Sequence, residues 1–199
     1  KQLTGLGAEV LEIPTIKIQN PDDKQEFAEG VGQVHTYDWL VFTSPNGVER
    51  FFDAFFSVYD DARSIGGVRI AAGGPGTAKM VNEYRLAVDL IPDTYIAEGL
   101  IKSFADNENI ENQTILWVRG AEARNTIQTG LSALGGIVDE CIAYKTVPEF
   151  DDPNGAKERF TTEGADVITF VSSSAVKHFF ALNMPYPDHC KVASIGPVT

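Results

Sequence analysis

The chain has 199 residues, of which 43% are hydrophobic, and this is enough to bury a core in one large domain or two small ones. Its formal net charge is −12 and its Lys and Arg residues are scattered, which excludes nucleic acid and anionic membrane surfaces as partners, because both require basic faces. No apolar run approaches the roughly 20 residues of a membrane span, and we recognise no signal peptide. Cys141 and Cys190 are far apart without metal-ligand spacing, so we interpret them as reduced, buried thiols in a soluble, cytoplasmic protein.

The first expected elements are a helix end and a strand. Residues 1 to 7 predict the last turn of a helix, which Gly7 closes as a C-terminal cap. A strand over 9 to 13 is expected next, with Pro14 after it. The stretch from 17 to 37 is polar and contains Asn, Pro, Asp and several Gly residues, a composition that indicates a linker.

Residues 38 to 52 predict a strand, a turn and a helix. The four apolar residues at 39 to 42 suit a central parallel strand that is buried on both faces. A polar turn follows at 43 to 47, where Ser44 is suited to cap the helix and Pro45 to take its first position.

Strands and helices continue to alternate up to a second polar stretch at 148 to 164, which again indicates a linker. Such alternation favours parallel, doubly wound sheets. In chain order the expected elements are a strand from 69, a Gly-Pro-x-Thr helix start ending at Thr77, a helix at 78 to 87, a strand at 88 to 91, a helix at 97 to 105, a strand at 115 to 118, the turn Arg119-Gly120, a helix through about Leu134, and a strand at 137 to 144.

Three pairs of segments repeat in the same order along the chain. Residues 3 to 10 align with 131 to 138, and residues 42 to 52 align with 170 to 180, both at an offset of 128. A third pair, 69 to 77 and 191 to 199, has an offset of 122. Each member of this third pair is a short strand that runs into a Gly-Pro-x-Thr turn. The repeats predict two homologous α/β halves.

The internal symmetry also predicts the domain organisation. Residues 38 to 147 would form one domain, and residues 1 to 16 with 165 to 199 would form the other, discontinuous one, so that the two linkers make a hinged clamp. Compared with the other copy, the discontinuous domain lacks roughly 20 residues at the front of the chain and about 30 at its back. We therefore expect the sequence to be a truncated form.

Ligands of open parallel α/β sheets bind at the carboxyl ends of the strands. The polar turns at 43–47, 73–77, 119–120, 172–174 and 196–199 are expected there. Glycine permits close approach to the backbone, and helix N-termini present unpaired N–H groups to anions. These turns are therefore either ordinary helix caps or anion sites. No nucleotide-binding motif is present, and His35, His178 and His189 are not spaced as metal ligands.

Two side chains at strand ends have two interpretations each. Arg119 follows a strand and either grips a carboxylate or forms a structural salt bridge. Tyr144 closes the strand before the second linker and either donates a proton or hydrogen bond, or simply packs. From the residues alone, the chain is a two-domain clamp for a small anion.

The ordered set of motifs TSPNGV, GPGTA, IPDTYIAEGL, WVRG, AYKTV and IGPVT resembles the uroporphyrinogen-III synthase family over essentially all 199 residues. The resemblance implies two flavodoxin-like α/β domains joined by a two-stranded linker, with the active site in the cleft between them. It implies a cofactor-free lyase that acts as a monomer on hydroxymethylbilane, a linear tetrapyrrole with eight carboxylates. Loss of water gives an azafulvene, ring D attacks through its substituted α-carbon to form a spirocyclic intermediate, and reclosure inverts ring D.

The resemblance also assigns roles to residues. Tyr144 is the implied proton donor to the departing hydroxyl group. The implied substrate-binding residues are Thr43, Ser44, Asn46, Gly76, Thr77, Arg119, Gly120, Ser172, Ser173, Ser174 and Thr199. The second serine turn, SSSA, departs from the Ser-Pro that is usual there. A non-catalytic two-domain anion binder and a regulatory, synthase-like module without activity are the alternatives.

Overall fold

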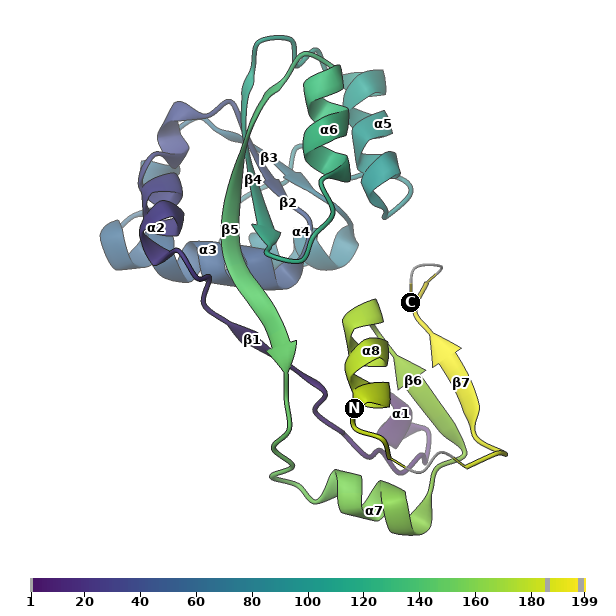
Figure 1. Cartoon of the computed structure of the whole chain (residues 1–199). Helices are drawn as coiled ribbons and strands as arrows, with labels where there is room; N and C mark the ends of the chain where they lie inside the picture. The colour runs from purple at the N-terminus through teal and green to yellow at the C-terminus, as the bar shows by residue number, and fades with distance from the viewer. Residues whose placement is uncertain (1, 185–186, 197–198) are drawn as a thin grey trace. The chain divides into compact units, whose positions relative to one another are not determined.

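The computed structural model describes residues 2–184, 187–196 and 199. The chain folds into two compact units, a larger unit of residues 18–145 and a smaller unit of residues 1–17 and 146–199. Two strands cross the boundary between the units, β1 (Ile16–Gln19) and β5 (Ile137–Pro148) (Figure 1). Each unit combines helices with pairs of parallel strands, so the α/β class predicted from the sequence is confirmed.

A five-stranded sheet in the order β1-β5-β4-β2-β3 forms the centre of the larger unit. The strand β2 (Trp39–Phe42) lies between β3 (Arg69–Ala72) and β4 (Thr114–Gly120), and all three are parallel. All four residues of β2 are fully buried, as expected for a central parallel strand. The strand β4 pairs in parallel with β5.

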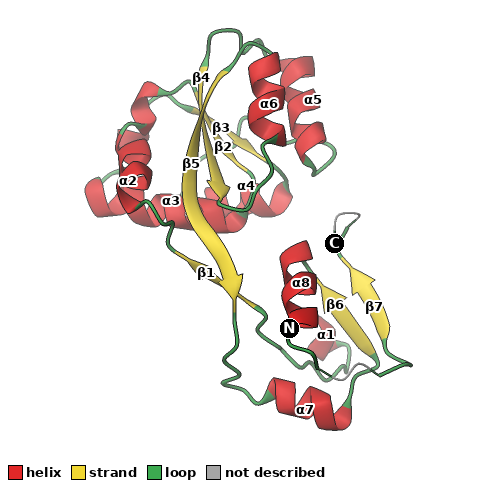
Figure 2. Ribbon diagram, viewed as in Figure 1, coloured by secondary structure: helices red, strands yellow, loops and turns green. Residues whose placement is uncertain are grey.

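Helices cover both faces of this sheet (Figure 2). One face carries α2 (Lys24–Gly32), α3 (Pro45–Val58) and α4 (Pro75–Glu83), and the other carries α5 (Ala97–Asn107) and α6 (Thr126–Ala133). Alternate residues of β2 serve the two faces: Leu40 and Phe42 belong to the core on the α3 side, whereas Trp39 and Val41 belong to the core on the α5 side. The period of two residues in a strand explains this division.

The helix α3 has a well-defined start and an aromatic inner face. The Ser44 side chain accepts a hydrogen bond from the Gly47 N–H, and Pro45 takes the first helical position, both as predicted. Phe51, Phe52 and Phe55 are fully buried against the sheet. Burying each such side chain stabilises the fold by about 1.5–3 kcal/mol, so this face fixes α3 on the sheet.

The segment after α4 differs from the prediction. The expected helix over 78–87 ends at Glu83, and the expected strand over 88–91 forms only an isolated bridge between Ala71 and Leu90. The Asp89 carboxylate accepts the Ile70 N–H at 2.8 Å, and the Asp89 N–H donates to the Ile70 carbonyl at 2.8 Å. These two bonds hold the segment to β3 without a continuous ladder.

The stretch at 17–37 does not remain an irregular linker. Besides the end of β1 it contains α2, which Asp23 caps, and a 3₁₀ turn at Val34–Thr36. Val31 and Val34 are fully buried in the core on the α3 side. Polar composition concealed this helix because only one of its faces is apolar. The second expected linker, 148–164, likewise contains a helix, α7 (Ala156–Glu163).

The smaller unit contains the parallel strands β6 (Val167–Phe170) and β7 (Lys191–Ser194), with α7, α8 (Ser173–Ala181) and the short α1 (Gln2–Gly5). Its core is built from Phe160, Phe170 and Phe179. Ser172 caps α8 as Ser44 caps α3, so the predicted repeat of strand, serine cap and helix is confirmed for this pair. Gly7 has the left-handed conformation expected of a helix C-cap, with φ of 87°.

The strand expected at 9–13 is absent, because regular pairing begins only at Ile16. Leu11 and Ile13 pack against the phenylalanine core of the smaller unit without joining its ladder, and this burial explains why the segment is apolar although it is not a strand. The helix start expected in the second Gly-Pro-x-Thr turn falls on residues 197–198, which lie outside the described residues. Every helix in the described part of the chain is too short or too polar to serve as a membrane span.

Candidate functional site

The carboxyl ends of β2, β3 and β4 bring several predicted site residues together in the larger unit. Thr43 and Ser44 follow β2 directly, Gly73 follows β3, and Gly120 is the last residue of β4. Strand pairing also places Tyr144, from β5, opposite Gly120. Because these strands are parallel and in register, residues far apart in the sequence meet at one edge of the sheet.

A hydrogen bond links Ser44 and Tyr144. Their hydroxyl oxygens are 2.9 Å apart, and either group can donate. Ser44 Oγ simultaneously accepts the Gly47 N–H at 3.1 Å, which anchors the serine to the first turn of α3. The rigid helix start therefore fixes the orientation of the Tyr144 phenol.

A shift in the pairing of β4 with β5 creates the position of Tyr144. Arg119 pairs with Ile142, but the next residue, Gly120, pairs with Tyr144, so Ala143 is left as an extra residue, as in a β-bulge. A Cβ atom added to Gly120 would lie 2.8 Å from Tyr144 Cε2 and 3.1 Å from its hydroxyl oxygen. The absence of a side chain at Gly120 thus allows the ring to lie against the backbone of β4.

The surroundings of Tyr144 keep its phenol protonated at neutral pH. Burial raises the pKa of Tyr144, the hydrogen bond with Ser44 lowers it in part, and the negative charge of Glu122 raises it again. The result is a pKa above the ordinary value of 10.0 for tyrosine. A half-buried phenol of this kind can donate a hydrogen bond or a proton to a neighbouring oxygen.

Arg119 has the structural role that was one of its two predicted interpretations. Its side chain is only 5% exposed and forms an ion pair with Glu140 at 2.5 Å. The guanidinium also donates to Asn125 Oδ1 at 3.0 Å, to the carbonyls of Gly120, Ala121 and Ala123, and lies 4.6 Å above the centre of the Trp117 ring. These contacts order the loop between β4 and α6. They engage the guanidinium with the protein itself, as the salt-bridge interpretation expected, and the role of Arg119 in binding a ligand carboxylate stays a prediction.

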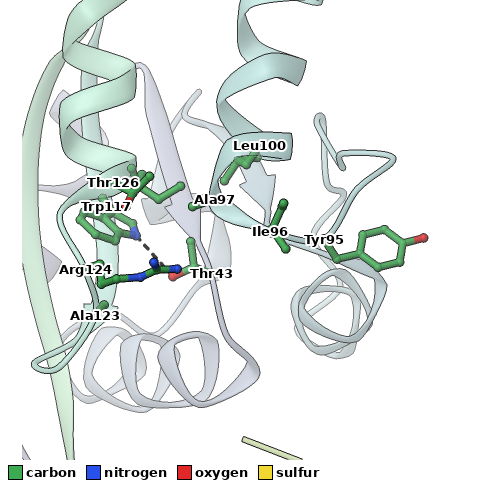
Figure 3. Close-up of a pocket in the computed structure, with 11 residues that line it drawn as sticks. Thr43, Tyr95, Ile96, Ala97, Leu100, Trp117, Ala123, Arg124 and Thr126 are labelled. Atoms are coloured by element: carbon green, nitrogen blue, oxygen red, sulfur yellow. Dashed lines mark hydrogen bonds between the residues drawn. The ribbon is translucent and has the colours of Figure 1, made fainter. Parts of the chain in front are cut away.

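A pocket of about 190 Å³ lies beside this edge of the sheet (Figure 3). Trp117 Nε1 donates to Thr43 Oγ1 at 3.3 Å on one wall, and Leu100 contributes an apolar surface. The exposed Arg124 extends toward Thr43, whereas the ring of Tyr95 points away from the pocket (Figure 3). Arg124 forms no hydrogen bond or ion pair with any other residue that the structure describes. The pocket therefore offers an apolar wall, a hydroxyl group and an available cation.

Sequence reasoning selected Arg119 and overlooked Arg124, five residues further along the chain. Arg119 is the penultimate residue of β4, whereas Arg124 is exposed in the loop before α6. The available signal was this position, because an arginine within a buried strand pairs with its neighbours, whereas one in the following loop does not. The link between Ser44 and Tyr144, 100 residues apart, had no local signal.

The other predicted binding residues differ in how they are presented. Asn46 and Gly76 are exposed at the N-termini of α3 and α4, where backbone N–H groups are available to an anion. Thr77 is only 5% exposed, so little of its surface is open to a ligand, and its binding role stays a prediction.

In the smaller unit, three of the predicted binding residues lie at the start of α8. Ser172 Oγ accepts the Ala175 N–H at 3.1 Å, Ser173 is exposed and Ser174 is half-buried. The Thr199 N–H donates to the Gly196 carbonyl at 3.2 Å. Across the described residues of both units, no group of three or more His, Cys, Asp and Glu side chains is placed to hold a metal ion.

The larger unit is thus an α/β domain built on a mainly parallel sheet. Its predicted hydroxyl groups, helix N-termini and pocket lie at the carboxyl ends of the strands, where enzymes of this class bind small molecules. The chain belongs to the uroporphyrinogen-III synthase family: the family described as uroporphyrinogen-III synthase HemD matches residues 1–199.

Named relatives agree with this assignment. The chain is 29% identical over 207 residues to the uroporphyrinogen-III synthase of Synechococcus elongatus, an alignment that covers 100% of this chain and 77% of the relative. It is also 29% identical over 181 residues to a porphyrin biosynthesis protein, HemD, of Ruminiclostridium josui, covering 91% of this chain but only 36% of that longer protein. The crystal structure of a mutant uroporphyrinogen III synthase from Thermus thermophilus has a TM-score of 0.65 at 19% identity, covering 99% of this chain and 79% of the other, and shows a similar fold.

Proposed function

We propose that the protein is a uroporphyrinogen-III synthase, which cyclises hydroxymethylbilane to uroporphyrinogen III with inversion of ring D through a spirocyclic intermediate. The observation that carries the proposal is the 2.9 Å hydrogen bond between Ser44 and Tyr144 at the strand ends of a chain that matches this family along its whole length. A protonated phenol held in one orientation is the group that this chemistry requires first.

The proposed reaction begins with Tyr144. Its phenol donates a proton to the departing hydroxyl group of the substrate, the C–O bond breaks, and water leaves as the pyrrole nitrogen supplies the electron pair that forms the azafulvene. Ring D attacks the new electrophile through its substituted α-carbon, and the spirocyclic intermediate then fragments and recloses. The ring carbon that forms the final bond loses its proton, which restores the phenol, so that the net change is the loss of one water molecule.

The proposed role of the rest of the site is to hold a flexible substrate in one geometry. Ser44 positions the phenol and does not itself react. The N-termini of α3 and α4, with Thr43, Asn46 and Gly76, would bind substrate carboxylates, each terminus favouring an anion by about 0.3–1 kcal/mol. Arg124 would add a charged contact in the neighbouring pocket. Restricting the substrate in this way accounts for much of the rate advantage of an enzyme with a reactive intermediate.

Several finer features belong to the same proposal. The enzyme would be a lyase that needs no cofactor and works as a monomer in the cytoplasm. Its two units would belong to two flavodoxin-like domains joined by a two-stranded linker, with Ser172, Ser173, Ser174 and Thr199 also binding substrate carboxylates. Parallel strands in both units, and the folding of the chain into two compact units, support this organisation.

The test is the isomer of the product. Hydroxymethylbilane is generated in situ, the protein is added, the product is oxidised, and type I and type III uroporphyrins are separated by chromatography. We expect type III, because the substrate without enzyme closes to type I. Type I alone, from protein that is folded by circular dichroism, would refute the proposal and favour a synthase-like module without activity.

Tyr144→Phe tests the assignment of the proton donor. We expect type III formation to slow by about a hundredfold, because general acid catalysis commonly contributes that much, but not to stop. The control is Tyr37→Phe, which also removes a phenol hydrogen bond, the 2.8 Å bond to Asp139, at a distance from the strand ends. A Tyr144→Phe rate equal to that of the control would remove Tyr144 from the mechanism.

A further inference from the structure

The larger unit has a second pocket, of about 570 Å³, whose lining residues include neither Ser44 nor Tyr144. Its walls come from the end of β1, the start of α2, the middle of α3 and the far part of β5, which lie together in the structure (Figure 1). Three basic side chains line it, Lys24, Arg50 and Lys145, together with one acidic side chain, Asp22. We call this group the basic pocket.

The charge of the basic pocket is opposite to that of the chain. Lys and Arg number 16 against 28 Asp and Glu, yet three of the cations gather here against a single carboxylate. An excess of positive charge in a protein of net charge −12 is not expected from random placement on its surface. Such a group creates a local positive potential that attracts anions.

The acidic residue does not neutralise the pocket. Lys145 pairs with Asp22, but the Asp22 side chain is 84% exposed, and a pair that is so open to water is worth at most about 1 kcal/mol. Arg50 is half-buried on α3, and its side chain has neither a hydrogen bond nor an ion pair with another described residue. Lys24 is exposed and also has no such partner within the described part of the chain.

Arg50 is the most informative member of the group. Its guanidinium carries five donors and is always charged. No buried side-chain nitrogen of the described residues lacks a hydrogen-bond partner, so the donors of Arg50 are open to solvent and available to a ligand in the pocket. A carboxylate matches this fork with two parallel hydrogen bonds. Lys145 and Lys24 would then balance the remaining charge of a ligand with more than one carboxylate.

We propose that the basic pocket is a second anion site, which binds a carboxylate group through Arg50 with Lys145 and Lys24 beside it. The group comes either from the tetrapyrrole, a source that rests on the proposed function, or from a separate small polycarboxylate. The site is distinct from the Ser44–Tyr144 pair, and its existence does not require that the protein be a synthase.

Binding of citrate, a tricarboxylate probe, tests the site without reference to activity. Isothermal titration calorimetry of the whole protein with citrate at low ionic strength should show one binding site, and added salt should weaken the affinity for citrate. Arg50→Gln should weaken citrate binding about tenfold or more, because it removes a charge-assisted, two-pronged contact. The matched control is Arg85→Gln, an exposed arginine on the same unit that lies outside the pocket. Equal affinities of these two variants, or no citrate binding by the unmodified protein, would overturn the proposal.

A conservative variant and a kinetic comparison complete the design. Arg50→Lys keeps the charge and the aliphatic stem, so it should bind citrate more tightly than Arg50→Gln does, and it remains informative if the glutamine variant fails to fold.

A rise in KM for hydroxymethylbilane in Arg50→Gln, with kcat kept, identifies the substrate as the source of the carboxylate. An unchanged KM with lost citrate binding identifies a separate anion. Failure of the synthase assay with intact citrate binding refutes only the proposed function.

Discussion

Gly120→Ala would displace the Tyr144 ring without touching its chemistry. An ideal Cβ at position 120 lies 2.8 Å from Tyr144 Cε2, 2.9 Å from Cζ and 3.1 Å from the hydroxyl oxygen, whereas ordinary van der Waals contact begins at 3.4 Å. The ring must therefore move by about half an ångström or more, which opens its 2.9 Å bond to Ser44. Because Gly120 does not have a positive φ, alanine adds no backbone strain, and the clash with the ring is the whole perturbation.

The expected cost has two parts. Overpacking of this kind destabilises a fold by about 1–3 kcal/mol, which thermal unfolding would register. Misplacement of a catalytic group by about 1 Å can reduce a rate by about a hundredfold, so a somewhat smaller shift should slow type III formation by about tenfold to a hundredfold. The control is Gly67→Ala, where an added Cβ meets no atom within 4 Å.

A double-mutant cycle decides whether the loss of rate passes through the phenol. If it does, Gly120→Ala should slow the unmodified protein but have little further effect in a Tyr144→Phe background, because the hydroxyl group is already absent. The same loss in both backgrounds would refute this reasoning, and so would full activity of Gly120→Ala.

Three further predictions test the site and the core. Ser44→Ala removes the α3 cap and the partner of Tyr144, so it should lower the free energy of unfolding by about 1 kcal/mol and also slow type III formation; a loss of stability without any loss of rate would contradict the positioning role. Phe52→Ala, at a fully buried site, should destabilise the larger unit by about 3–5 kcal/mol in denaturant unfolding, and a value below about 1 kcal/mol would contradict the packing. Burial raises the pKa of Cys141 from 9.0 to about 12, so between these pH values the thiol keeps its proton in the folded protein and loses it in the unfolded chain. The free energy of unfolding should therefore fall as pH rises from 9 toward 12. Cys141→Ala should make that fall shallower.

Local signals were sufficient to predict the centre of the fold. The four apolar residues of β2, the Ser44 cap and Pro45 act within a few residues of each other, and the structure has each of them where the sequence placed it. The repeat of this unit around Ser172 was also visible, because a duplicated fold preserves its caps.

Features that depend on distant partners were predicted poorly. The apolar residues at 9–13 indicated the burial of Leu11 and Ile13, but a strand also needs a paired neighbour, which the local sequence does not reveal. The helix α2 was concealed by polar composition, although its apolar residues recur at helical spacing. The role of Arg119 depends on Glu140, which lies on the neighbouring strand.

The extra residue of β5 gives two consecutive side chains to one face of the sheet. Cys141 and Ala143 face the core on the α3 side, and because Ala143 lacks a partner on β4, the next residue, Tyr144, packs against that same core. Deleting Ala143 would restore regular alternation after Ile142 and would leave Tyr144 opposite Gly120 on the same face. Homologous chains can therefore lack the extra residue and still keep a phenol at this position, so the pairing of the tyrosine with the strand-end glycine, and not the bulge itself, is the feature to compare between them.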